Sequence, residues 1–194
     1  MNVEVKICGL TRRCDAMLAA ELGADYLGFV IWSGSRRHVP IAALPELTRG
    51  LPPCVRKVGV FVDAARDEML RAVEAGSLDV VQLHGRESAD FARAVDFAEV
   101  WKATYDADFP AERLVCDAPQ GGSGRPGDHE KAAELARIRL VMLAGGVTPD
   151  NACEFVRRVR PAGIDLAGGV ESAPGIKDEG KMKRLFLNLK GMES

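Results

Sequence analysis

Short apolar segments recur along the 194-residue chain and alternate with amphipathic ones. Runs this short that are rich in β-branched residues predict strands rather than buried helices. Nearly every position within them is apolar, so both faces of the resulting sheet must be covered, which is typical of parallel sheets. Eight strands are predicted, at residues 3–9, 26–32, 55–62, 79–85, 99–104, 113–118, 140–146 and 163–169.

Amphipathic segments between most of these strands predict helices. They cover residues 14–22, 65–75, 132–137, 151–160 and 181–190. The segment between the fifth and sixth strands is too short for a full helix, so one helix is expected to be missing or vestigial. Three strands also follow a glycine and then an aspartate, which predicts helices that end on a left-handed glycine with the aspartate in the next turn.

Eight alternating units of this kind favour a single (β/α)8 barrel of parallel strands, with the fifth helix short or absent. A doubly wound open sheet is the alternative, because it is built from the same βα units. No linker, low-complexity tract or break in composition divides the chain. We therefore expect one catalytic domain over residues 1–194.

Composition narrows the classes of function. Hydrophobic residues make up 47 % of the chain and charged residues 28 %, and the net charge is −2. Charges of both signs are interspersed, which disfavours a nucleic-acid partner. No apolar run approaches the roughly 20 residues that span a bilayer, and no signal sequence is evident, so we expect a cytoplasmic protein without a membrane partner. The oligomeric state is left open between monomer and homodimer.

Cysteine and histidine usage gives no support for a metal or redox site. The five cysteines are scattered without paired spacing, and the three histidines lie far apart in the sequence. Zinc and disulfide exchange motifs use closely spaced ligands. We therefore expect reduced thiols and no metal site.

Two glycine pairs follow the last two strands, Gly145 with Gly146 and Gly168 with Gly169. In a barrel the active site lies at the carboxyl ends of the strands, and the loops after strands 7 and 8 often bind phosphate. Glycine lets backbone N–H groups approach an anion, and a helix expected to begin near Pro149 adds its positive end. Tight turns that need glycine for geometry alone are the alternative explanation.

Cys8 ends the first strand and Asp117 ends the sixth. A thiol and a carboxyl at one barrel mouth can act as base and acid if the site separates their proton affinities. Taken alone, each has a structural explanation, since a cysteine at a strand end often packs in the core and an aspartate there often caps a turn.

Three further features lie at the same ends. Arg36 and Arg37 follow the second strand, where an arginine can hold a carboxylate or simply face solvent. His84 ends the fourth strand and either orients a ligand or completes a turn. The glycine-rich stretch at residues 120–124 has the composition of a mobile lid.

Several motifs in order resemble those of phosphoribosylanthranilate isomerases of tryptophan biosynthesis. They are VKICGLT, GADYLGFV, VGVFVD, VVQLHG, CDAPQGGSG, LAGGVTPDN, GVES and PGIKD, and the resemblance runs from about residue 3 to residue 190. It implies a (β/α)8 barrel without a regular fifth helix. It also implies an Amadori rearrangement of N-(5′-phosphoribosyl)anthranilate, a phosphorylated aminosugar, without a metal or organic cofactor.

The same resemblance implies roles for individual residues. Cys8 would be the general base and Asp117 the general acid. Arg37 would hold the anthranilate carboxylate, and His84 is included among the substrate-binding candidates. Gly145, Gly146, Gly168 and Gly169 would bind the phosphate through backbone N–H groups. The chain departs from the family at Ala167 and Gly168, where serines are usual, which leaves the phosphate only backbone donors there.

Other functions stay open at this point. Another phosphosugar barrel, such as an indoleglycerol-phosphate synthase or a thiamin-phosphate synthase, is one of them. The former needs a lysine near the mouth, for which Lys6 and Lys102 are available. A non-catalytic barrel that binds a phosphorylated ligand is another, and the presence of both Cys8 and Asp117 argues against it.

Overall fold

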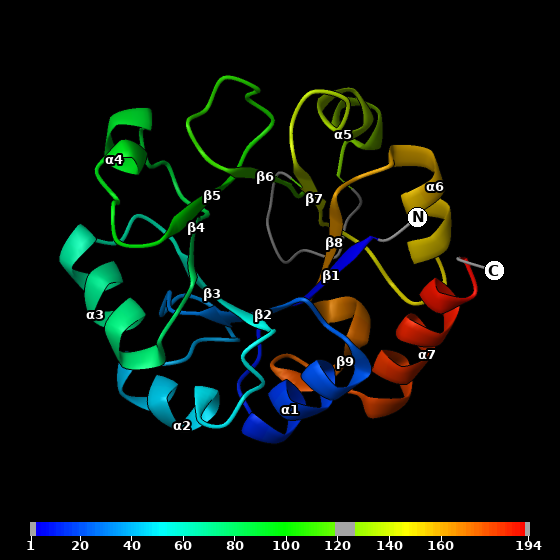
Figure 1. The fold of residues 1–194 in the computed structure, drawn as a ribbon, viewed down its shortest axis with the longest axis horizontal. Coiled ribbons are helices and arrows are strands. Elements are labelled where there is room, and N and C mark those ends of the chain that lie inside the picture. The colour runs from blue at the N-terminus through cyan, green and yellow to red at the C-terminus, as the bar shows by residue number, and fades with distance from the viewer. Residues whose placement is uncertain (1–2, 119–126, 193–194) are drawn as a thin grey trace.

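Eight parallel strands close into a barrel in the computed structural model, which describes residues 3–118 and 127–192 (Figure 1). Each strand pairs with the next along the chain, and the last pairs with the first, so the open doubly wound alternative is wrong. All eight predicted strands are present. They are β1 (Glu4–Ile7), β2 (Tyr26–Val30), β3 (Arg56–Phe61), β4 (Val80–Leu83), β5 (Glu99–Ala103), β6 (Arg113–Cys116), β7 (Val141–Leu143) and β8 (Gly163–Leu166).

Helices surround this barrel in Figure 1, and the connection between β5 and β6 has none. Residues 104–112 are all described, so the expected absence of the fifth helix is confirmed. No described helix is long and apolar enough to cross a membrane. The α-helices are α1 (Arg13–Leu22), α2 (Leu44–Thr48), α3 (Arg66–Gly76), α4 (Ala89–Arg93), α5 (His129–Leu135), α6 (Ala152–Val159) and α7 (Glu179–Lys190).

Short elements escaped the sequence prediction because they span too few residues to show a period. These are α2, α4, the 3₁₀ helices η1 (Ile41–Ala43) and η2 (Gly168–Val170), and an antiparallel pair formed by β9 (Glu171–Ala173) and β10 (Ile176–Lys177). Three helix starts also differ from the prediction by two or three residues. The helix predicted at residues 181–190 begins at Glu179, after the side chain of Asp178, which accepts from the Lys181 N–H. The side chain of Asp128 caps α5 by accepting from the Lys131 N–H, so this helix begins three residues early. The helix expected near Pro149 begins at Ala152.

The glycine–aspartate repeat is only partly right. Gly23 ends α1 with a φ of 106°, as predicted, but α3 and α6 end on left-handed Ser77 and Arg160. Asp25 and Asp79 do lie just before strands. The Asp25 carboxylate accepts from the amide of Val5 on β1 at 2.8 Å, and the Asp79 carboxylate accepts from the amide of Lys57 on β3 at 2.7 Å. In the third copy the aspartate, at position 165, lies inside β8 instead.

Two apolar cores follow from the alternation of side chains along each strand. One lies between the strands and the helices and holds residues such as Leu27, Phe61 and Leu114. The other fills the barrel and contains Tyr26 and Trp101, whose ring centroids lie 4.8 Å apart. The interior core also includes Cys8, which directly follows β1 at the carboxyl end of that strand. Side chains therefore fill the barrel interior as far as Cys8, and the open space lies at the carboxyl ends of the strands.

A buried ion pair fixes the loop that follows β4. Lys102 on β5 donates to a carboxylate oxygen of Glu87 at 2.6 Å and to the carbonyl of Gly85 at 2.7 Å. The same carboxylate accepts from the amides of Asp63 and Gly85, so it ties the ends of β3 and β4 together. Both charged side chains are buried. Removing one partner from such a pair leaves the other charge buried without compensation.

We expect Glu87→Ala to lower the free energy of unfolding by about 3 kcal/mol, measured by urea denaturation. Glu46→Ala is the matched control, because its partner Arg49 and Glu46 itself are both exposed. That change should cost less than about 0.5 kcal/mol. Equal losses in the two variants would contradict the role given to the buried pair.

Candidate active site

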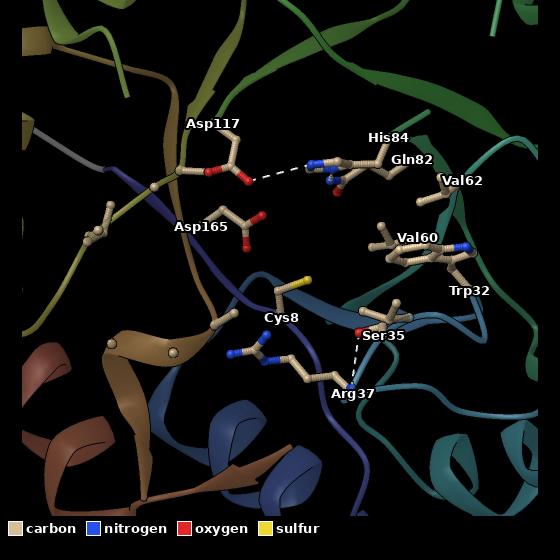
Figure 2. Close-up of a pocket in the computed structure, with 18 of the residues that line it drawn as sticks. Cys8, Trp32, Ser35, Arg37, Val60, Val62, Gln82, His84, Asp117 and Asp165 are labelled. Atoms are coloured by element: carbon tan, nitrogen blue, oxygen red, sulfur yellow. Dashed lines mark hydrogen bonds and ion pairs between the residues drawn. The ribbon is translucent and has the colours of Figure 1, made fainter. Parts of the chain in front are cut away.

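A cavity of about 580 Å³ opens at the carboxyl ends of the strands. Its polar and apolar lining residues come from most of the strand ends, and Figure 2 shows their side chains around one space. All eight sequence-predicted site residues line it: Cys8, Arg37, His84, Asp117, Gly145, Gly146, Gly168 and Gly169. The structure therefore brings together residues that lie up to 161 positions apart in the sequence.

Cys8 directly follows β1, and its side chain is only 8 % exposed. Gly28 on the neighbouring strand makes room for it, since a Cβ there would lie 2.7 Å from the Cys8 sulfur. Burial raises the pKa of the thiol above its ordinary value, and the positive charge of Lys6 opposes that rise. Lys6 is itself buried and donates to Asp165 at 2.7 Å. The thiol is thus a shielded group with a cation beside it.

Gly9 has the turn that the sequence suggested, with a φ of 72°. Its lack of a side chain serves Arg37, because a Cβ at this position would overlap the Cδ of that arginine. Glycine at this position therefore has a steric reason within the protein.

Asp117 directly follows β6, and His84 follows β4. The Nε2 of His84 lies 3.5 Å from the Oδ2 of Asp117 (Figure 2). Burial raises the pKa of Asp117, although the charge of His84 and a hydrogen bond from the Ala118 amide oppose the rise. Burial also lowers the pKa of His84. The carboxyl therefore holds its proton to a higher pH than an exposed aspartate does.

Arg37 reaches the cavity from the loop after β2. Its Nε and Nη2 donate to the two carboxylate oxygens of Glu171 at 2.9 and 2.8 Å, a bidentate arrangement. Nη1 donates to no acceptor in the described part of the chain, so Nη1 and the second N–H of Nη2 form an edge that is open to a ligand. Arg36 is exposed and does not line the cavity. Only Arg37 of the two neighbours can meet a ligand there.

The two glycine pairs form one surface. Gly145 and Gly146 have φ values of 80° and 70°, which strain any other residue. A Cβ at Gly169 would overlap the carbonyl oxygen of Val147, so the loops after β7 and β8 touch at that point. None of the four glycine amides donates to an acceptor within residues 3–118 and 127–192. These amides are available to an anion.

Sequence reasoning gave no role to several residues that the structure places on the cavity. Trp32 is 45 % exposed and lines the cavity together with Val60 and Val62 (Figure 2). Gln82 on β4 and Asp165 on β8 also line the cavity, and each has one buried oxygen without a partner among the described residues. A polar residue inside an apolar strand was the available signal for both. The lid predicted at residues 120–124 lies outside the described residues.

Comparison with known proteins connects this geometry to a family. The family model of N-(5′-phosphoribosyl)anthranilate isomerase matches residues 5–188. The chain belongs to this family. The N-(5′-phosphoribosyl)anthranilate isomerase of Chromohalobacter salexigens is 42 % identical, covering 96 % of this chain and 93 % of the relative.

Solved structures of the family agree with the fold. The phosphoribosylanthranilate isomerase of Thermus thermophilus has a TM-score of 0.93 and 43 % identity, with 98 % of this chain and all of that one covered. A family structure in complex with reduced 1-(o-carboxyphenylamino)-1-deoxyribulose 5-phosphate has a TM-score of 0.89 and 31 % identity, with the same coverage.

Membership in the phosphoribosylanthranilate isomerase family decides between the enzyme classes that the sequence left open. The chain is an isomerase, not a synthase or a non-catalytic barrel. The positions of the two lysines fit this result. Lys102 is held by Glu87 and Lys6 by Asp165, and neither is among the residues that line the cavity.

The raised pKa of Asp117 in this isomerase predicts a cost in stability. A carboxyl whose folded-state pKa lies above its ordinary value of 3.8 stabilises the fold below that pH, and the contribution is lost as the pH rises through the folded-state pKa. Asp117→Asn removes the titration. We expect this variant to have a higher unfolding temperature than the parent at pH 7.5 and no advantage near pH 3.5, measured by thermal denaturation.

The exposed Asp90 offers a control, because its carboxylate makes only a surface pair with Arg93. Asp90→Asn should change the unfolding temperature by a similar small amount at both pH values. A gain for Asp117→Asn that is independent of pH would contradict the assignment of the effect to ionisation.

Proposed function

We propose that the protein catalyses the Amadori rearrangement of N-(5′-phosphoribosyl)anthranilate to 1-(2-carboxyphenylamino)-1-deoxyribulose 5-phosphate in tryptophan biosynthesis, with Cys8 as general base and Asp117 as general acid. One observation carries the assignment of residues. A buried thiol and a half-buried carboxyl, which directly follow different strands, enter the same cavity as a guanidinium edge and four glycine amides with no described acceptor. The substrate offers a partner for each, since it has a carboxylate, a phosphate and two sites of proton transfer.

The reaction divides into proton transfers that conserve all atoms. Asp117 gives a proton to the ring oxygen of the furanose, the bond from that oxygen to C1 breaks, and the nitrogen lone pair forms a Schiff base. Cys8 then takes the proton from C2, the released electron pair forms a double bond between C1 and C2, and the π pair of the C1–N double bond returns to the nitrogen as its lone pair. The resulting enolamine tautomerises, with a proton added at C1 and one lost from the C2 hydroxyl, to give the ketone.

The electrostatics support this division of roles. Asp117 begins the reaction protonated, which its raised pKa favours. Cys8 must be a thiolate when it acts, and burial opposes this. The cation of Lys6 lowers that cost, and the positive charge of the Schiff base in the open substrate does so further. The base therefore becomes competent when the first step has placed a cation in the cavity.

The anions at the two ends of the substrate fix its direction in the cavity. The glycine amides after β7 and β8 receive the phosphate, and the free edge of Arg37 receives the anthranilate carboxylate as a bidentate partner. The rings of anthranilate and Trp32 can then share the apolar wall formed with Val60 and Val62.

Cys8→Ser and Asp117→Asn should each reduce kcat at least about 10³-fold, because a positioned acid or base contributes about that much. The readout is loss of anthranilate-type fluorescence as the substrate is consumed. Both variants should keep the circular dichroism spectrum of the parent. Wild-type turnover in either variant would remove that residue from the mechanism.

Arg37→Ala should raise KM by about tenfold to hundredfold and change kcat less, because it removes a bidentate contact with the substrate carboxylate. Arg36→Ala is the matched control, since Arg36 is the exposed neighbour, and its KM should stay within twofold of the parent. An unchanged KM in Arg37→Ala together with a raised KM in Arg36→Ala would show that Arg36, and not Arg37, makes the contact.

A further inference from the structure

The antiparallel pair β9–β10 carries two buried charges that the mechanism above does not use. Glu171 begins β9 and Lys177 ends β10, and Lys177 belongs to the motif PGIKD, to which sequence reasoning gave no role. The ammonium of Lys177 donates to Glu171 Oε1 at 2.8 Å, and the side chain of the lysine is fully buried. A charge in such a position is costly unless it is paired and hydrogen-bonded, so its contacts show what it holds.

Those contacts lead to the backbone of the proposed base. The Lys177 ammonium donates to the carbonyl oxygen of Cys8 at 2.5 Å and to that of Ala167 at 3.2 Å. Cys8 ends β1, and Ala167 directly precedes the glycine pair after β8. One ammonium group therefore joins the residue proposed to move the C2 proton to the loop proposed to hold the phosphate.

The same pair also reaches the proposed carboxylate site. Glu171 binds Lys177 with one oxygen and uses both oxygens for Arg37. The hairpin is in turn anchored on α1, because the amide of Lys177 donates to the Asp15 carboxylate at 3.0 Å. The three groups proposed to contact the substrate, Cys8, Arg37 and the glycine loop after β8, are thus held by one buried charge pair outside the barrel strands.

We propose that Lys177 is a positioning residue for the isomerisation, fixing the Cys8 backbone against the phosphate loop and presenting a positive charge to the thiol. The proposal rests on the role of Cys8 as base. A misplacement of about 1 Å can cost a reaction about 100-fold, so a group that sets the distance between base and phosphate acts on turnover without touching the substrate.

The charged groups that face the thiol come from four segments. Lys6 on β1, Lys177 on β10 and Arg37 on the loop after β2 are positive, and Asp165 on β8 is negative. Lys6 and Asp165 neutralise each other as a pair, and Arg37 is matched by Glu171. Loss of the Lys177 charge therefore leaves the thiol facing two neutralised pairs, which disfavours the thiolate.

The test compares Lys177→Met with Lys181→Met in the full chain. Lys181 on α7 is the matched control, because its ammonium donates to the backbone carbonyl of Glu171 at 2.6 Å and so holds the same hairpin without contacting Cys8. Three quantities are measured: kcat and KM, the urea midpoint, and the rate at which iodoacetamide alkylates Cys8 as a function of pH, read by mass spectrometry of the Cys8 peptide.

We expect Lys177→Met to lower kcat by about tenfold to hundredfold, with a smaller change in KM. The alkylation midpoint should move to a pH about 1 higher, because a nearby positive charge is gone. Lys181→Met should keep kcat and the alkylation midpoint of the parent, whatever it does to the urea midpoint. An alkylation profile and kcat in Lys177→Met that match those of Lys181→Met overturn the proposal.

A lower kcat in Lys177→Met with an unmoved alkylation midpoint also overturns the proposal, because the lysine would then only stabilise the fold and would not act on the Cys8 thiol. If Lys177→Met does not fold, Lys177→Gln is measured instead, because its neutral amide can still donate to the carbonyl of Cys8, and the same alkylation shift is expected from the loss of charge. Cys8→Ser is measured in parallel. Full activity there contradicts the proposed base itself, whereas an inactive Cys8→Ser beside an unaffected Lys177→Met contradicts only the role of the lysine.

Discussion

The pairing of β8 with β1 is the constraint on which the site depends. It closes the barrel between two ends of the chain and sets Lys6 opposite Asp165, so that a buried cation and a buried anion meet at 2.7 Å. The same ladder continues upward, where the amide of Cys8 donates to the carbonyl of Leu166 at 2.8 Å. The thiol and the glycine pair after β8 are neighbours for this reason alone, although about 160 residues separate them in the sequence.

The parts of the site that the sequence predicts well are those fixed by where an apolar run stops. Cys8, His84 and Asp117 each follow directly on a buried strand, so their position at the mouth follows from the strand prediction and from the geometry of parallel barrels. Three of the four glycines are predictable for a similar reason, because the left-handed backbone at Gly145 and Gly146 and the close approach of Gly169 to Val147 restrict residue type. Closure itself is different, since the periodicity of βα units is the same in an open sheet and in a barrel. The motifs supplied that step.

Contacts between distant charges are what the sequence does not predict. Asp165 looks like the turn aspartates at positions 25 and 79, and only the register of β8 shows that it points into the barrel toward Lys6. Glu171 and Lys177 lie in an irregular segment, and their partners Arg37 and Cys8 come from the other end of the chain. A local pattern reports whether a residue is buried in a strand or helix, but it carries no information about which opposite charge will be brought to it.

These buried charges explain how one small cavity can hold an acid and a base. Burial raises the pKa of both Cys8 and Asp117. Desolvation alone therefore favours the protonated form of each group and does not distinguish the acid from the base. The separation comes from what faces each one. Cations are gathered around the thiol, whereas the carboxyl has a histidine whose pKa burial lowers. Burial keeps the histidine toward its neutral form, and fixed cations near the thiol favour its ionised form, so the neighbours that barrel closure provides suit the acid and base roles proposed for Asp117 and Cys8.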